Sequence, residues 1–178
     1  MKNLFIICLI VLLSPLWRDG TGQAQTAVFI PDTNFRNCLN NDYPFVMNGT
    51  GDSLIISAAS SISGLLNCSF KNISDLTGVE YFTNITLLLC TGNSLTVLPP
   101  FDSLSALEYL DCSSNQLTSL PNLSGCPALA YIDCYGNELD SLPNLSANTS
   151  LTTLICFSNQ LTFLPDLSTN TSLKTLSC

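Results

Sequence analysis

LEYLDCSSNQLTSLPNL, residues 107–123, decides the fold, because its leucines, cysteine, asparagine and proline recur along the chain at one fixed spacing. Cysteines occupy positions 68, 90, 112, 134, 156 and 178, so that every gap is 22 residues. Asparagines at 93, 115, 137 and 159 and prolines at 99, 121, 143 and 165 share this spacing. Three residue types in one register indicate a repeat unit, L-x-x-L-x-C-x-x-N-x-L-x-x-L-P-x-L, and repeats of this length are typical of solenoids.

The repeat unit resembles the leucine-rich repeat, in which L-x-x-L-x-L-x-x-N/C-x-L marks each coil. The match covers about residues 63–178. The segment ISDLTGVEYFTNIT, residues 73–86, resembles internalin-like repeats, and IPDTNFRNCL, residues 30–39, resembles the opening cap of secreted bacterial leucine-rich repeat proteins. The resemblance implies an α/β-type repeat solenoid that is curved and right-handed. It also implies a parallel sheet on the concave side, 22-residue coils and a helical N-terminal cap.

Strand alternation assigns the positions that face the core in each unit. In L-x-x-L-x-C the fourth and sixth residues point inward, which places Leu110 and Cys112 inside one coil and Ile132 and Cys134 inside the next. The family resemblance places the asparagine amide inside the turn that follows the strand. There it would satisfy backbone groups that would each cost about 1–3 kcal/mol if left unpaired.

The periodic cysteines have three interpretations. Stacked positions on parallel strands lie about 4.8 Å apart with parallel side chains, whereas a disulfide needs converging Cβ atoms about 3.8 Å apart. Zinc also needs converging ligands, which a straight file with one cysteine per coil does not provide. We therefore predict a buried ladder of reduced thiols, formed by Cys68, Cys90, Cys112, Cys134 and Cys156. Cys38 and Cys126 lie outside this file, and the spacing leaves their pairing open.

Composition excludes several classes of function. The formal net charge is −8 and histidine is absent, which argues against binding to nucleic acid or to an anionic membrane surface and removes the commonest general base and metal ligand. No phosphate-binding loop, nucleophile elbow or metal-spaced Cys/His cluster occurs. We predict no catalytic residue, no metal site and no cofactor.

The N-terminus has the organisation of an export signal. Lys2 precedes an unbroken apolar run from Leu4 to Leu13, which is shorter than the roughly 20 residues that a membrane span needs. Gly22-Gln23-Ala24 is a candidate cleavage site. We therefore expect a signal peptide over 1–24 and a secreted or cell-surface location for the mature chain.

Two further regions follow the predicted signal peptide. Residues 25–62 lack the repeat and are expected to form an N-terminal cap, with a helix that Asp32 caps and that has Phe35, Cys38 and Leu39 on one apolar face. Residues 63–178 are expected to form the repeats. Lys71 replaces the asparagine in the first unit, so its turn is expected to differ. The last coil is incomplete, and we expect that more coils follow in the natural protein.

The outward strand positions supply the candidate binding site. The third, fifth and seventh residues of each unit face away from the core, and in two adjacent coils they place Tyr-x-Asp beside Tyr-x-Asp. The candidate residues are Tyr109, Asp111, Tyr131, Asp133, Tyr135 and Phe157. Exposed aromatics beside carboxylates are typical of recognition surfaces, although cross-strand stacking alone would also explain them.

Other roles for these polar residues have weaker support. Two carboxylates on an open face lack the desolvated cleft that glycosidase chemistry needs, and alone they make a weak calcium site. NGTGDSLIIS, residues 48–57, departs from the calcium-loop pattern and is better interpreted as a turn. Glycosylation sequons at Asn84, Asn122, Asn144 and Asn148 are attributed to a polar surface.

The predicted function is that of an exported, non-enzymatic binding module. Its partner would be a protein or a glycan on another surface, recognised through the concave face. One alternative is a scaffold within a longer surface protein whose activity lies in a C-terminal domain beyond this sequence. A second alternative is a structural spacer with no ligand of its own.

Overall fold

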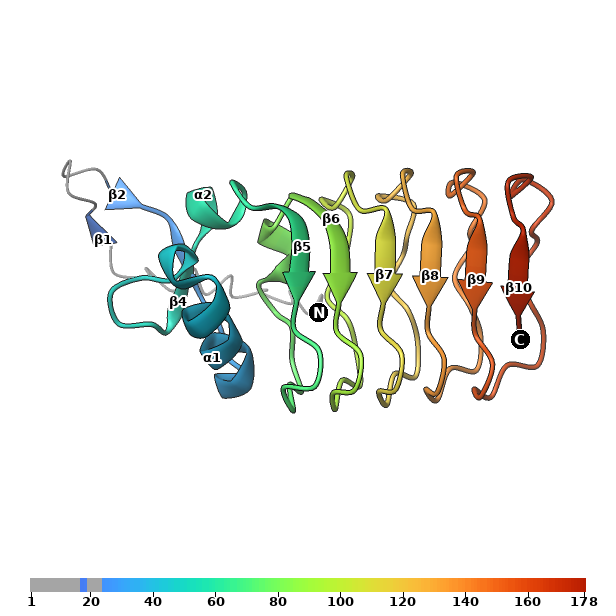
Figure 1. The fold of residues 1–178 in the computed structure, drawn as a ribbon, viewed down its shortest axis with the longest axis horizontal. Coiled ribbons are helices and arrows are strands. Elements are labelled where there is room, and N and C mark those ends of the chain that lie inside the picture. The colour runs from blue at the N-terminus through green and yellow to red at the C-terminus, as the bar shows by residue number, and fades with distance from the viewer. Residues whose placement is uncertain (1–16, 19–23) are drawn as a thin grey trace, which may run out of the picture.

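The computed structural model describes residues 17–18 and 24–178, so most of the predicted signal peptide lies outside the described residues. Its main feature is a six-stranded parallel sheet whose strands follow one another in chain order, as Figure 1 shows. The strands are β5 (Ser63–Asn67), β6 (Asn84–Leu89), β7 (Tyr109–Asp111), β8 (Tyr131–Asp133), β9 (Thr153–Ile155) and β10 (Thr175–Ser177). This architecture confirms the predicted leucine-rich repeat solenoid with a parallel sheet and coils of 22 residues.

The strand register follows directly from the repeat length. Leu110 pairs with Ile132, Ile132 with Leu154, and Leu154 with Leu176, so each step across the sheet is one repeat. The chain returns between strands through turns and extended segments. In the first coil, this return path includes the short 3-10 helix η2 (Val79–Tyr81).

One apolar core runs through the coils. The predicted inward residues Leu110, Cys112, Ile132 and Cys134 all have no exposed surface, and the leucines of the return segments pack against them. The eight described cysteines are free thiols, and Cys178 is the exposed one. The predicted ladder of buried, reduced thiols is therefore confirmed for its five members.

The repeated asparagine joins neighbouring coils. The Asn115 side chain lies inside the turn, where Nδ2 donates to the carbonyl of Cys112 in its own coil at 3.1 Å. It also donates to the carbonyl of Cys90 in the preceding coil at 3.0 Å, and Oδ1 accepts from the Leu95 N–H of that coil at 3.1 Å. Asn93, Asn137 and Asn159 repeat this pattern. The family resemblance implied the contacts within the turn, and the structure adds the contacts with the preceding coil.

A second repeated feature is a left-handed residue two positions after each of the five ladder cysteines. Its φ lies between 53° and 66° in each coil, at Phe70, Gly92, Ser114, Gly136 and Ser158. Glycine adopts this conformation without the clash that a Cβ atom introduces, whereas a bulky residue such as phenylalanine is rare there. The coils with Phe70, Ser114 and Ser158 therefore keep the left-handed turn although these residues do not favour a positive φ.

The N-terminal segment, residues 24–62, packs against the first coil. Its helices are α1 (Thr33–Asp42), η1 (Pro44–Val46) and α2 (Ile56–Ala59), and its strands are β2 (Ala24–Gln25), β3 (Ala27–Phe29) and β4 (Ser53–Ile55). β3 pairs antiparallel with β4, and β2 pairs antiparallel with β1 (Trp17–Arg18). The predicted apolar face of the helix is correct, since Phe35, Cys38 and Leu39 are buried in the core that the coils share.

Asp32 links this segment to the solenoid. It caps α1 as predicted, because Oδ1 accepts from the Phe35 N–H at 2.8 Å. Its second oxygen accepts from the N–H and hydroxyl of Ser74 in the first coil, at 2.8 and 2.7 Å, and from the Asp75 N–H at 3.2 Å. Partial burial raises the pKa of Asp32, but the donors from Phe35 and Ser74 outweigh it and hold that pKa below its usual range.

Candidate functional site

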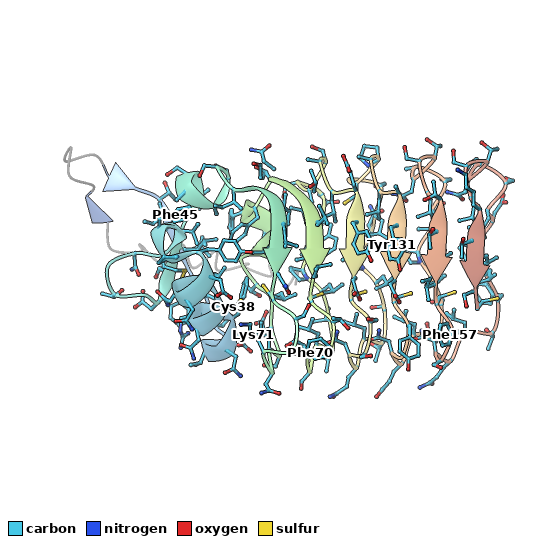
Figure 2. The ribbon with its side chains drawn as sticks, in the orientation of Figure 1. Cys38, Phe45, Phe70, Lys71, Tyr131 and Phe157 are labelled. Atoms are coloured by element: carbon cyan, nitrogen blue, oxygen red, sulfur yellow. The ribbon has the colours of Figure 1, made fainter. Side chains whose placement is uncertain are left out.

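Five of the six predicted site residues lie on two adjacent coils, and the sixth lies on the next coil. β7 and β8 place Tyr109 directly beside Tyr131 and Asp111 directly beside Asp133. Tyr135 follows β8 by two residues, and Phe157 follows β9 by two. We call these six residues the aromatic–acidic surface, and Figure 2 shows Tyr131 on the face of the sheet. The structure thus brings the predicted residues together, while their role in binding stays a prediction.

The aromatic side chains form two stacked pairs. The rings of Tyr109 and Tyr131 are 4.1 Å apart between centroids and nearly parallel, with an angle of 5° between their planes. Tyr135 and Phe157 are 4.5 Å apart with an angle of 35°, and about two fifths of each of these two side chains is exposed. The first pair stands on the flat part of the sheet and is half-buried. The second pair therefore offers more of its apolar area to a partner.

The two carboxylates are only partly satisfied within the protein. Asp111 Oδ1 accepts from the backbone N–H and the hydroxyl of Ser113, at 3.0 and 2.6 Å. Asp133 Oδ1 accepts from the Tyr135 N–H at 3.0 Å. Burial and, to a smaller extent, the neighbouring charge of Asp111 raise the pKa of Asp133, against the effect of that N–H donor. Among the described residues, no side chain or backbone donor bonds the outer oxygen Oδ2 of either aspartate, so both are free to accept from a ligand.

One outward position behaves differently from the prediction. The alternation places Ser113 on the concave face, but its side chain is buried because it bonds Asp111 and lies 2.7 Å from the Thr91 hydroxyl. Its role is to orient Asp111 rather than to meet a partner. Ser113 follows Cys112 directly and lies two residues beyond Asp111. Sequence reasoning overlooked that a serine at this distance can hydrogen-bond the aspartate.

The concave face continues toward the N-terminal segment into a hollow of about 650 Å³. Leu89 and Thr91 line it from the sheet, and Asp42, Tyr43, Asn67, Ser69, Phe70 and Lys71 complete its walls. Lys71 Nζ lies 3.5 Å from an oxygen of Asp42, with both side chains well exposed. Sequence reasoning missed this hollow, because Asp42 and Tyr43 in its wall come from the N-terminal segment, which the repeat does not relate to the coils.

The buried thiols have low reactivity. Cys90, Cys112 and Cys134 each donate to a carbonyl of the next coil, at 3.3, 3.5 and 3.4 Å. Burial raises the pKa of Cys134 to about 12 and raises that of Cys112 well above its usual value, so both stay protonated at neutral pH. No group of three or more potential metal-ligating residues is present in the part of the chain that was described.

Two smaller predictions have different outcomes. The turn predicted over residues 48–57 is correct only for residues 48–52, because β4 and α2 follow. In this turn Asn48 Oδ1 accepts from the N–H groups of Asp52 and Ser53, and Asp52 Oδ1 accepts from Asn48, Thr50 and Ser53. The surface assignment of the sequon at Asn148 is wrong, because that side chain is fully buried. Its Nδ2 donates to the carbonyls of Leu123 and Cys126 in the preceding coil, at 3.0 and 2.8 Å. Asn170 repeats this bond one coil later.

The parallel sheet, the coils of 22 residues and the buried asparagine in each turn define the class of leucine-rich repeat proteins. A family model described as leucine-rich repeats (two copies) matches residues 83–124 and 105–147. No curated protein matches the chain. No helix among the described residues is long and apolar enough to cross a membrane.

Two solved structures from Listeria monocytogenes are similar to the chain. The functional domain of InlJ, which includes a cysteine ladder, is 27% identical, with a TM-score of 0.57 over 88% of this chain and 43% of that one. The internalin InlF is 19% identical, with a TM-score of 0.57 over 83% of this chain and 56% of that one, and this likeness concerns the fold alone. The chain thus has the leucine-rich repeat fold of these two structures, and it spans less than half of the InlJ domain.

Proposed function

We propose that the chain is an exported, non-enzymatic binding module that recognises a protein or a glycan through its concave face. The observation that carries the proposal is the aromatic–acidic surface. Four aromatic rings stand there beside two carboxylates that each keep an outer oxygen without a partner in the described structure. Aromatic anchors surrounded by polar groups are typical of interface centres.

The shape of the surface favours a large partner. Small molecules usually bind in deep, enclosed pockets, whereas these six residues lie on the open face of a sheet. Leu87, Leu89 and Ile155 occupy flanking outward positions and extend the contact area with apolar side chains. A protein surface with basic and aromatic residues would complement it best. A glycan, whose hydroxyls would donate to Asp111 and Asp133, is the second candidate.

The same geometry supports a non-enzymatic role. Asp111 and Asp133 stand on adjacent strands without the water-excluding cleft that lets one carboxyl act as an acid. The thiols of the ladder are buried and protonated, so they offer no nucleophile at neutral pH.

Binding to defined probes tests the proposal. The labelled chain is applied to a glycan microarray and to an array of purified extracellular protein domains, alongside the triple variant Tyr109→Ala, Tyr131→Ala and Tyr135→Ala. We expect the wild type to bind at least one probe and the variant to lose about tenfold or more in affinity. Phe45→Ala is the matched control, because it removes an exposed aromatic ring from η1, away from the surface.

Two outcomes of this experiment contradict the proposal. A variant that stays folded by circular dichroism and binds every probe like the wild type would move recognition away from the aromatic–acidic surface. A wild type that binds no probe would favour the spacer, or the scaffold of a longer protein whose activity lies in another domain.

Export is a separate part of the proposal, supported by the apolar run that begins at Leu4 and by Gly22-Gln23-Ala24. We expect the chain produced with residues 1–24 in a bacterial host to appear outside the cytoplasm, with an N-terminal sequence that starts at Gln25. Cytoplasmic retention of the uncleaved chain would refute this part without touching the binding surface.

A further inference from the structure

The hollow between the N-terminal segment and the first coil contains an aromatic residue in an unfavourable conformation. Phe70 has a φ of 55°, which is rare for a bulky residue and costs free energy. Phe70 is also 76% exposed, so burial of its ring in the core does not offset this cost. The residues at the equivalent position of the later coils are all small: Gly92, Ser114, Gly136 and Ser158. A phenylalanine at this position therefore needs a reason other than the fold.

Contacts with the next coil hold the Phe70 ring in place. The Phe70 N–H donates to the carbonyl of Thr91 at 2.9 Å. The ring lies against the backbone of Gly92, where an added Cβ atom would clash with it. Figure 2 shows Phe70 and Lys71 in the turn that follows β5. An exposed side chain that is held in an unfavourable conformation is typical of positions that contact a ligand.

Polar groups of both charges line the hollow beside this ring. Lys71 Nζ lies 3.5 Å from an oxygen of Asp42, and this exposed pair supplies hydrogen-bond donors and acceptors whose charges cancel. Asn67 Oδ1 accepts from the Ser69 N–H at 3.0 Å, while Asn67 Nδ2 has no partner among the described residues. The Ser69 hydroxyl is buried and also lacks a partner within the described part of the chain. Rotation of this hydroxyl toward a ligand would gain a hydrogen bond.

We propose that this hollow binds the ring of a neutral sugar, such as a hexose or an N-acetylhexosamine. Its volume of about 650 Å³ lies within the range of small-molecule sites. A sugar ring has an apolar face of C–H groups, which would pack on Phe70 and Leu89. Its hydroxyls both donate and accept hydrogen bonds, so they would pair with Lys71, Asp42 and the free amide of Asn67.

The charge balance of the hollow favours a neutral ligand over an ion. An anion that binds Lys71 would have to compete with Asp42, and a cation that binds Asp42 would have to compete with Lys71. Either competition leaves one charge of the pair without its partner, whereas hydroxyls can bond both groups at once. The site uses none of the six residues of the aromatic–acidic surface. The inference therefore goes beyond the proposed function and does not depend on it.

A nuclear magnetic resonance titration of the isotope-labelled chain tests the proposal. Glucose, galactose, mannose and N-acetylglucosamine are added separately, at concentrations up to their solubility, and the backbone N–H signals are followed. We expect at least one of these sugars to shift the signals of Ser69, Phe70 and Lys71 in a saturable way. The signals of Asp111 and Asp133 should stay in place. Acetate and methylammonium, which match only one charge of the hollow each, should not saturate it.

Phe70→Gly separates binding from stability. The variant removes the ring and relieves the unfavourable φ, so we expect it to melt at the same temperature as the wild type or higher. Its affinity for the sugar should fall by about tenfold or more. Phe163→Ala is the matched control, because it removes a ring of similar exposure from the return segment after β9 and should leave sugar binding unchanged.

Four results would overturn the proposal. They are the absence of a saturable shift with every sugar, shifts that gather at Asp111 and Asp133 instead, saturation by acetate or methylammonium in place of the sugars, and wild-type affinity in folded Phe70→Gly. If Phe70→Gly does not fold, the position of the shifts in the wild type still decides. Because the two surfaces have separate signals, a failure here leaves the proposal for the aromatic–acidic surface untouched.

Discussion

The central coils, residues 85–167, and the junction between the N-terminal segment and the first coil bury the same kind of apolar core through different contacts. Each central coil repeats one asparagine that bonds its own turn and the coil before it. The first coil has Lys71 in that position, and its turn is completed by Asn93 from the following coil. On its other side, Asp32, Asn34 and Tyr43 of the N-terminal segment supply the partners.

This difference shows how a solenoid begins. A coil in the middle obtains hydrogen bonds from an identical neighbour, so one residue type at one spacing is sufficient. The first coil has no identical neighbour before it, and each of its backbone groups needs a partner of its own. The junction therefore has the bridges that differ from the repeat: Asp32 to Ser74, Asn34 to the Asn72 carbonyl, and Tyr43 to the Leu65 carbonyl.

The largest expected effect tests whether the two regions unfold together. Phe35→Ala empties a fully buried site at the junction and should lower the free energy of unfolding by about 3–5 kcal/mol. Leu110→Ala, its counterpart in a central coil, should cost about 2–5 kcal/mol. Urea denaturation followed by circular dichroism measures both. A separate early transition in Phe35→Ala would show that the N-terminal segment is not part of the cooperative unit.

The asparagine of the central coils gives the next largest effect. Asn137→Ala removes the acceptor of the Leu117 N–H and a donor to the carbonyls of Cys112 and Cys134, and should cost about 1–3 kcal/mol. Asn144→Ala is the control, because that exposed side chain has one local bond, to the Ser146 N–H, and should cost less than about 1 kcal/mol. Equal losses in the two variants would contradict the role assigned to the coil-bridging amide.

Asp32 is the corresponding polar bridge at the junction. Asp32→Ala should cost about 1–2 kcal/mol near neutral pH, through loss of the α1 cap and of the bonds to Ser74. Because folding lowers the pKa of Asp32, its contribution is present above the unfolded value of about 3.9 and is lost as the pH falls through the lower folded value. The stability difference between wild type and variant should therefore shrink in acid. A difference that is unchanged at pH 2 would contradict this.

The smallest expected effect on stability concerns the residue with a positive φ, which occurs in the first coil and in the central coils. Ser114→Gly relieves the Cβ clash at a φ of 53° but loosens the unfolded chain, so the net gain should be about 0.5 kcal/mol. Gly136→Ser, at the same position one coil later, should lose a similar amount. Melting temperatures that move in one direction for both variants would show that the conformation is not the cause.

Sequence reasoning was correct for most positions that the period of 22 residues relates. One offset relates the strand partners from β6 to β10, so their register, the inward leucines and cysteines and the neighbouring Tyr-x-Asp segments follow from the spacing. The pairing of β5 with β6 shifts by one residue between Gly64 and Leu65, which the spacing did not predict. The buried Asn148 was missed although the same offset contained it, because Cys126, Asn148 and Asn170 share one position. Ser113 was placed outward because alternation ignores a side chain that bonds its neighbour.

The contacts at the junction could not be predicted from the sequence, for a physical reason. Asp32 and Ser74 meet because two dissimilar segments fold against each other, and no local pattern or period relates their positions. The hollow lined by Tyr43, Lys71 and Leu89 has the same origin. The sequence could supply the helix and its cap, but not the partner surface.

Each repeated asparagine bonds the coil before it, so the boundaries between central coils are equivalent to one another. Removing residues 108–129, or duplicating them, would present the next asparagine with the same carbonyls and the same N–H that it meets now. Insertions of whole coils thus preserve these hydrogen bonds, while an insertion of any other length breaks the match. The number of coils, and with it the area of the concave face, is therefore a quantity that simple duplication of the gene segment can adjust.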